Sequence, residues 1–248
     1  MSNELIRIAM WSGPRNISTA MMRSWENRQD TVVVDEPLYG PYLFQTDKKH
    51  AAYDDIMQVQ GIDWQPIVKA LTETPPEGAD SQTKVFYQKH MRHHLTPDIE
   101  LDFVDQLRNG FLIRHPNDVL SSYLRKHHRA TPEDLGYPQQ VKLFDWIKER
   151  TGTTPPILES KDILMNPEVM LKKLCSALEV PFDSAMLAWP KGYRDSDGLW
   201  AEHWYNRVIE STGFSDYIPK ENKLSKEEQR IADACLPYFE ILMEYKII

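Results

Sequence analysis

The sequence predicts an α/β protein in which a parallel sheet lies between two layers of helices. Short apolar runs alternate along the chain with stretches of helical pattern, the order expected of strand–helix–strand units. The runs occur at residues 6–11, 31–36, 84–89, 110–114 and 155–160. Of the 248 residues, 41% are hydrophobic and 27% are charged, which is typical of a globular protein. We therefore expect one domain over residues 1–248.

The first run leads through a loop of small residues into a helix. Residues 6–11 predict a strand, after which apolar residues recur at helical spacing. They are Ile17, Ala20, Met21 and Trp25. A helix that begins near Asn16 would present unpaired N–H groups and the positive end of its dipole, which suit a phosphate or sulfate. Arg15, Ser18 and Thr19 add a cation and two hydroxyls. For this loop alone, a capped turn with an exposed arginine is an equally good interpretation.

The second and third runs place acid–base groups at strand ends. Residues 31–36 end in Glu36, and His90 follows residues 84–89. The carboxyl ends of parallel strands are where α/β proteins bind ligands, so Glu36 is expected beside a site. Its structural alternative is a helix-cap or surface carboxylate. Between the two runs, residues 72–83 predict a loop.

The fourth run repeats the pattern of strand, loop and helix. Residues 110–114 end in Arg114, and Pro116 stands where a helix would begin. Arg114 and Ser122 can converge on a phosphate. The alternative is an ion pair between Arg114 and Asp118, which for this stretch alone is the simpler interpretation.

The last run, residues 155–160, predicts a fifth strand, and the chain ends in a helix. Ser225 and Glu228 have the spacing of a capping box. One face of this helix carries Ile231, Cys235, Tyr238 and Leu242. Pro237 predicts a kink. We interpret the helix as core packing.

Charge and composition exclude several kinds of partner. The net charge of −8 argues against a nucleic-acid surface, although a local cationic pocket remains possible. No apolar run approaches the ~18 residues of a membrane span, and the first residues do not resemble a signal peptide. Cys175 and Cys235 imply no disulfide framework. We expect a cytoplasmic protein that contacts neither nucleic acid nor membrane; the sequence indicates no oligomeric state.

A cluster of histidines raises the question of a metal site. His90, His93 and His94 lie together, but no carboxylate or further histidine stands beside them at helical ligand spacing. A cationic loop near an anionic ligand explains them as well. We expect no metal.

Together, the two anion-binding stretches resemble the sulfotransferase family. In that family the first loop binds the 5′-phosphosulfate of PAPS (3′-phosphoadenosine 5′-phosphosulfate). Here it reads Pro14, Arg15, Asn16, Ile17, Ser18 and Thr19. The family's 3′-phosphate motif is an arginine, a proline two residues on and a serine eight residues after the arginine. Arg114, Pro116 and Ser122 have this spacing. Weaker similarity covers residues 157–183 and 198–204 and the C-terminal helix, and the nearest subgroup is the sulfotransferase-like domains of bacteria and of branched-chain aminotransferase-like proteins.

The resemblance implies a P-loop-like fold and metal-independent transfer of a sulfuryl group from PAPS to a hydroxyl or amine of a small molecule. It implies that residues 14–19, Arg114 and Ser122 bind PAPS. Arg15 would also be catalytic, in place of the family's usual lysine, and Ile17 stands where glycine is common. Trp200 and Trp204 are candidates for the segment that closes over the cofactor.

The catalytic base has two candidates. The acceptor loses a proton as it attacks sulfur, and a positioned carboxylate or imidazole usually takes it. Glu36 resembles a glutamate that follows the second strand in some bacterial sulfotransferases. His90 resembles the histidine of a Lys-x-His stretch, but its register differs by one residue. We favour Glu36, with His90 as the alternative.

Two other classes of function remain open. A small-molecule kinase of the same fold is disfavoured, since the chain has no Gly-Lys-Ser/Thr to bind magnesium and phosphates. A non-catalytic nucleotide-binding module is the other alternative.

Overall fold

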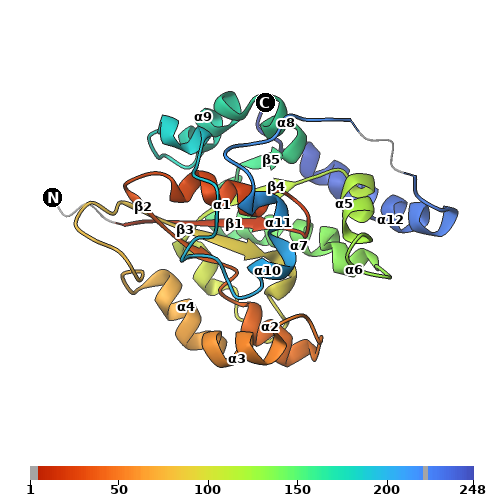
Figure 1. The fold of residues 1–248 in the computed structure, drawn as a ribbon, viewed down its shortest axis with the longest axis horizontal. Coiled ribbons are helices and arrows are strands. Elements are labelled where there is room, and N and C mark those ends of the chain that lie inside the picture. Colours follow the sequence, from red (N-terminus) through yellow and green to blue (C-terminus); the bar gives the residue numbers. More distant parts are fainter. Residues whose placement is uncertain (1–4, 220–222) are drawn as a thin grey trace.

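The computed structural model, which describes residues 5–219 and 223–248, is built around a five-stranded parallel sheet. The strands lie in the order β2-β3-β1-β4-β5, with helices on both faces (Figure 1). They are β1 (Ile6–Ser12), β2 (Thr31–Asp35), β3 (Val85–Met91), β4 (Arg108–Ile113) and β5 (Ile157–Glu159). Each strand overlaps a predicted run, with ends that differ by at most two residues, and the three-layer α/β prediction is confirmed.

Helices of varied length connect and cover the strands. The longer ones are α1 (Ser18–Glu26), α2 (Tyr39–Thr46), α3 (Tyr53–Gln60), α4 (Trp64–Thr72), α5 (Pro116–Tyr123), α7 (Tyr137–Thr151), α9 (Pro167–Ala177) and α12 (Lys226–Met243). The shorter ones are α6 (Pro132–Leu135), α8 (Ser160–Met165), α10 (Ala201–Trp204) and α11 (Asn206–Ile209), with 3-10 turns η1 (Arg92–His94), η2 (Asp102–Gln106) and η3 (Ser184–Leu187). No helix in the described ranges is long and apolar enough to cross a membrane.

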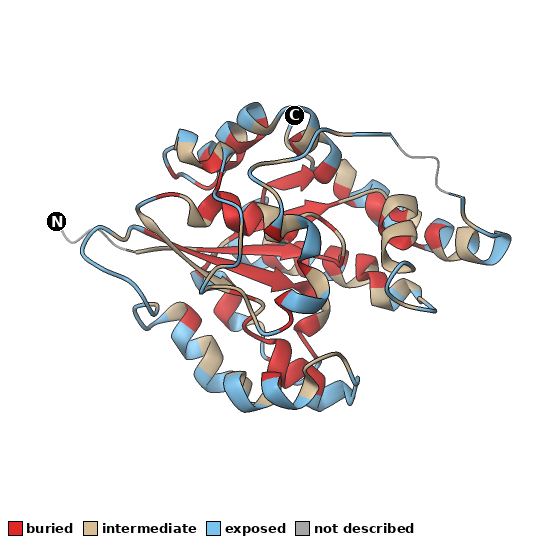
Figure 2. Ribbon diagram, in the orientation of Figure 1, coloured by how far each residue is buried: buried red, intermediate tan, exposed pale blue. Residues whose placement is uncertain are grey.

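The central strand divides the core into two layers because successive side chains point to opposite faces of a sheet. Ile8 and Met10 of β1 pack in the cluster beneath α1, α8 and α9. Ala9 and Trp11 pack in the cluster beneath α5, α7 and α12. All four side chains are fully buried, as expected of a strand in the middle of a parallel sheet. Figure 2 shows this buried centre, with exposed residues on the outer sides of α3 and α4.

The C-terminal helix begins at the predicted capping box. The Ser225 hydroxyl accepts from the Glu228 backbone N–H, and the Glu228 side chain accepts in return from the Ser225 N–H. Cys235 and Leu242 are buried as predicted, but Tyr238 is exposed, and the prediction for it was wrong. The inward face carries Phe239 in its place, which stays in line with the buried Ala232 and Cys235. The helix continues through Pro237 without a break.

Candidate active site

The loop between β1 and α1 passes twice through left-handed backbone conformations. Arg15 has φ 61° and Ile17 has φ 56°. Because Ile17 cannot join a right-handed helix at that φ, α1 begins at Ser18, two residues later than predicted. A left-handed residue followed by helical ones turns successive N–H groups toward one side, which makes a concave site for an anion. The first N–H groups of α1 have no carbonyl partner inside the helix.

Contacts from neighbouring elements hold this loop close to the sheet. A Cβ on Gly13 would lie 2.6 Å from the Leu135 carbonyl oxygen, so only glycine allows this approach. The Ser160 hydroxyl lies 3.1 Å from the Asn16 carbonyl oxygen and 3.0 Å from that of Ile113. Ser160 thus ties the loop to the end of β4, a role that the sequence gave no signal for.

The left-handed φ of Ile17 predicts an inverted order of stability for two substitutions. Both Ile17→Gly and Ile17→Ala remove the side chain's packing, but only glycine adopts a positive φ without steric cost. We expect Ile17→Gly to be the more stable by about 1 kcal/mol, although it is the smaller residue. Urea unfolding of both variants measures the difference. An alanine variant at least as stable as the glycine variant would contradict the left-handed conformation.

The two predicted phosphate motifs contact each other. The Arg15 Nε–H donates to the Ser122 hydroxyl at 3.0 Å, and an Arg114 Nη1–H donates to the Arg15 carbonyl oxygen at 3.0 Å. Arg114 also lies 3.7 Å from the Asp118 carboxylate, as the alternative interpretation of this stretch expected. That pair is partly exposed, with each side chain 20% accessible, so it leaves the guanidinium open to a ligand.

A group of arginines makes this end of the site cationic. Burial, and then the positive charges of Arg207, Arg114 and Arg125, lower the pKa of Arg15 from its ordinary value. Arg207 of α11 also lines the cavity described below, although sequence reasoning did not single it out. In the part of the chain that the structure describes, neither Arg15 nor Arg207 forms an ion pair. Their charges are available to an anionic ligand.

One cavity of about 570 Å³ joins these groups to the end of β2. All eight predicted cofactor-binding residues line it: Pro14, Arg15, Asn16, Ile17, Ser18, Thr19, Arg114 and Ser122. Glu36 lines the same cavity. The cavity is therefore lined by cations, by a helix N-terminus and by a carboxylate.

Glu36 lies in a buried, highly polar setting. Its carboxylate accepts a hydrogen bond from the Lys89 ammonium at 2.5 Å and lies 3.8 Å from Nε2 of His94. Burial raises the pKa of Glu36 above its ordinary value; the positive charge of Lys89 opposes this rise, and the negative charge of Asp35 adds to it. A carboxyl group whose pKa is raised in a cleft is a candidate for acid–base chemistry.

His90 is a correction to the predicted site. The residues that line the cavity do not include it. Its ring stacks on Trp11 with centroids 4.3 Å apart, and Nε2 lies 3.1 Å from the Gln88 side-chain oxygen. Neighbouring residues of a strand point to opposite faces, so Lys89 faces the cavity and His90 faces away. The geometry argues against His90 as the base.

His94 is a site residue that sequence reasoning considered only as part of a histidine cluster. Its ring stacks on Tyr39 and Tyr42, with centroids 4.6 and 4.7 Å away, and its Nδ1 is buried without a hydrogen-bond partner in the described chain. Burial lowers the pKa of His94 well below its ordinary value, so the ring is neutral beside Glu36. The signal in the sequence was its position just after β3. Among the residues described, no group of three or more His, Cys, Asp or Glu is arranged to hold a metal.

Aromatic rings line much of the cavity. They include those of Tyr39, Tyr42, His50, His93, His94, Tyr123, His127 and Trp204. Burial lowers the pKa of His50 to about 4 and that of His93 to about 3, so these rings are neutral at physiological pH. The cavity therefore combines neutral aromatic rings with charged side chains, among them Lys48 beside the Tyr42 ring and Lys89 beside Glu36.

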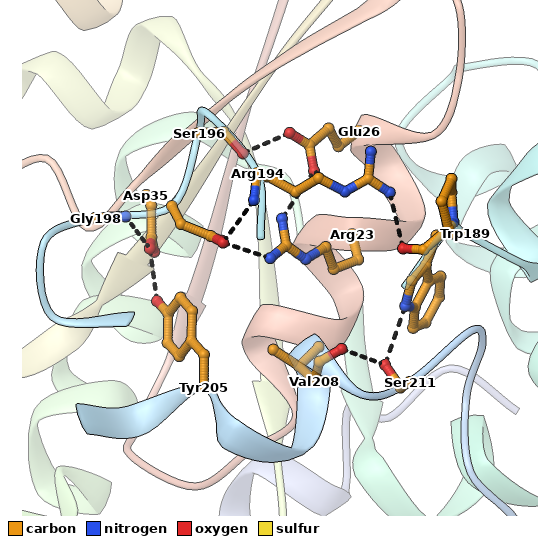
Figure 3. A network of polar contacts seen from close by, with 12 residues as sticks. Arg23, Glu26, Asp35, Trp189, Arg194, Ser196, Gly198, Tyr205, Val208 and Ser211 are labelled. Atoms are coloured by element: carbon orange, nitrogen blue, oxygen red, sulfur yellow. Dashed lines mark hydrogen bonds and ion pairs between the residues drawn. The ribbon is translucent and has the colours of Figure 1, made fainter. Parts of the chain in front are cut away.

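The segment after η3 crosses α1 and β2 and is fixed by buried polar contacts (Figure 3). Arg23 donates to Asp197 at 2.6 Å, and Ser196 donates to Glu26 at 2.5 Å. The two predicted closing residues differ in position. Trp204 lines the cavity and stacks on His127, with ring centroids 5.3 Å apart. Trp200 is buried and does not line the cavity.

The chain matches the family model described as "Sulfotransferase domain" over residues 6–245. The chain belongs to the sulfotransferase domain family. The resemblance predicted from the two phosphate motifs is confirmed.

Relatives and solved structures agree with this assignment. Branched-chain-amino-acid aminotransferase-like proteins 2 and 1 of Arabidopsis thaliana are 31% identical over 95% and 96% of this sulfotransferase domain. The domain spans only 41% and 42% of their lengths. The sulfotransferase domain from the curacin biosynthetic pathway superposes with a TM-score of 0.56 at 17% identity. The match covers 98% of this chain and 99% of that domain. A sulfotransferase from Alicyclobacillus acidocaldarius has a TM-score of 0.55 at 10% identity, and the match covers 98% of this chain and 97% of that protein. At these identities the likeness establishes the P-loop-like sulfotransferase fold alone.

Proposed function

We propose that this sulfotransferase domain transfers a sulfuryl group from PAPS to a hydroxyl or amine of a small-molecule acceptor, without a metal. The observation that carries the proposal is the shared cavity, which is lined by the loop 14–19, by Arg114 and by Glu36. In the proposal an anionic donor binds to the loop and Arg114, and the acceptor binds beside Glu36 and faces the transferred group.

In this proposal Glu36 acts as the general base. It accepts the proton of the acceptor hydroxyl or amine as the acceptor's lone pair forms a bond to sulfur. The bond from sulfur to the 5′-phosphate oxygen breaks, and 3′-phosphoadenosine 5′-phosphate leaves with that electron pair. Arg15 and the first N–H groups of α1 stabilise the negative charge that develops on the leaving phosphate. Because no metal ion has to bridge two phosphates, the chemistry does not require the magnesium ion of a nucleoside triphosphatase.

The test is a comparison of nucleotides by thermal unfolding. A ligand that binds only the folded protein stabilises it by about 2.7 kcal/mol at 100 times its dissociation constant. We expect strong stabilisation by 3′-phosphoadenosine 5′-phosphate and none by ATP with magnesium. A response to ATP with magnesium alone would favour a kinase. Binding of the 3′-phosphorylated nucleotide without transfer from PAPS to any acceptor in a library would favour a non-catalytic module.

Arg114 should recognise the 3′-phosphate. We expect Arg114→Ala to weaken 3′-phosphoadenosine 5′-phosphate binding by about tenfold to a hundredfold, the value of a charged hydrogen bond. Adenosine 5′-phosphate, which lacks the 3′-phosphate, should lose little affinity. Calorimetric titration of both nucleotides measures this difference. Equal losses for the two would mean that Arg114 only supports the loop through the Arg15 carbonyl oxygen.

A further inference from the structure

Lys89 has no free donor. A lysine ammonium has three N–H groups, and here three oxygens accept from it: those of Asp35 at 2.7 Å, Glu36 at 2.5 Å and Tyr205 at 2.7 Å. The side chain is fully buried. Its position is therefore set by these three partners, of which Glu36 and Tyr205 line the cavity and Asp35 does not.

The other two partners also hold each other. The Tyr205 hydroxyl donates to the Asp35 carboxylate at 2.6 Å and accepts from Nε1 of Trp200 at 2.9 Å. The same oxygen of Asp35 accepts from the Gly198 N–H at 3.3 Å. Figure 3 shows Tyr205, which lies between α10 and α11, pointing toward Asp35, with Gly198 on the other side of the carboxylate. Asp35 is buried and does not line the cavity.

We propose that Asp35 and Tyr205 are positioning residues for Glu36 and act on it through Lys89. This inference rests on the proposed function in taking Glu36 as the base. Residues 198–205, which are far from β2 in sequence, thereby hold the base through Asp35 and Lys89. The base takes its working position only when this segment is in place.

The charges around Glu36 give the inference a direction. The groups that face it are Asp35 from β2, Lys89 from β3, His94 from η1 and Tyr39 from α2, with Tyr205 behind Lys89. Asp35 takes a share of the Lys89 charge. Without the Asp35 charge, the positive charge of Lys89 acts mainly on Glu36, and the pKa of Glu36 falls. Without the Tyr205 hydroxyl, Asp35 attracts Lys89 more strongly, and the pKa of Glu36 rises.

The direct test is a carbon-13 NMR titration of protein labelled at the glutamate carboxyl carbon, with Glu36→Gln used for assignment. We expect Asp35→Asn to lower the Glu36 pKa by about one unit or more, and Tyr205→Phe to raise it. Tyr87→Phe is the matched control. Tyr87 is a fully buried tyrosine on β3 whose hydroxyl has no hydrogen-bond partner in the described chain. Its loss should leave the titration unchanged.

Turnover gives a second readout. Tyr205→Phe should lower kcat by about tenfold, with 3′-phosphoadenosine 5′-phosphate affinity unchanged, whereas Tyr87→Phe should change neither. If the pKa of Glu36 is the same in Tyr205→Phe as in Tyr87→Phe, the proposal is overturned, even if Asp35→Asn fails to fold. The titration needs no acceptor. If the pKa of Glu36 shifts as expected while Glu36→Gln keeps its activity, Glu36 is not the base, but its coupling to Asp35 and Tyr205 is supported.

Discussion

Replacing Glu36 with glutamine is expected to lower turnover by about 10²–10⁴, the contribution of a positioned general base. Glutamine keeps the shape and can still accept from Lys89, but it cannot take a proton from the acceptor. PAPS affinity should stay nearly the same, because in the proposed arrangement Glu36 contacts the acceptor and not the nucleotide. Single-turnover kinetics with PAPS, together with nucleotide titration, separates the two quantities.

The pH dependence of the rate identifies the base independently. A base works when it is deprotonated, so activity is present above its pKa and is lost as the pH falls through it. Burial raises the pKa of Glu36 above the ordinary 4.5, so as the pH is lowered the rate should already be lost at a pH higher than 4.5. With His90 as base the fall would come near pH 3, because burial lowers the pKa of that ring to about 3.

A control and a contradicting result complete this test. Glu149→Gln removes an exposed carboxylate on α7 and should leave the rate unchanged. If Glu36→Gln is nearly as active as wild type while His94→Asn is inactive, the neutral imidazole beside Glu36 is the base.

Arg15→Ala is expected to lower turnover by about 10²–10³, the effect of removing one donor that stabilises charge in the transition state. PAPS affinity should fall less, because the charge on the leaving phosphate grows as the sulfur–oxygen bond breaks. Arg15→Lys should restore part of the rate, since lysine is the family's usual residue there. Rates at saturating PAPS, set beside the dissociation constant, measure the split.

The contact between Arg15 and Ser122 makes the opposite outcome informative. If Arg15→Ala weakens PAPS binding and leaves the saturated rate unchanged, Arg15 belongs with Arg114 and Ser122 at the 3′-phosphate. Arg230→Ala, an exposed arginine on α12, is the control for loss of a positive charge elsewhere. It should change neither quantity.

The half of the proposed site formed by the loop 14–19, Arg114 and Ser122 could be located from the sequence because it is local. Strand, small-residue loop and helix are consecutive in the chain, so residues 14–19 carry their own geometry. Arg114 and Ser122 are likewise a strand end and a position two turns into the next helix. The predicted start of α1 was two residues too early. The cause is the left-handed backbone of Ile17, which apolar periodicity does not reveal.

The half around Glu36 depends on contacts between distant segments. Periodicity predicted that residues 84–89 form a strand, but a shift of one residue along it exchanges the two faces. The parallel pairing of β3 with β1 and β2 decided that Lys89 faces Glu36 and that His90 faces Trp11. Asp35 preceded Glu36 in the sequence as a second carboxylate, yet nothing in the sequence indicated its partner.

By itself the sequence determined the parallel α/β architecture, the five strands and the loop that resembles a phosphosulfate site. Each of these follows from short-range patterns of apolar residues, turn residues and helix-start signals. Only the tertiary structure decided that Tyr205, 170 residues from Asp35 along the chain, closes a hydrogen-bond network behind Glu36. The physical reason is that a buried ammonium needs oxygen acceptors from whichever segments surround it, and the fold alone determines which segments those are.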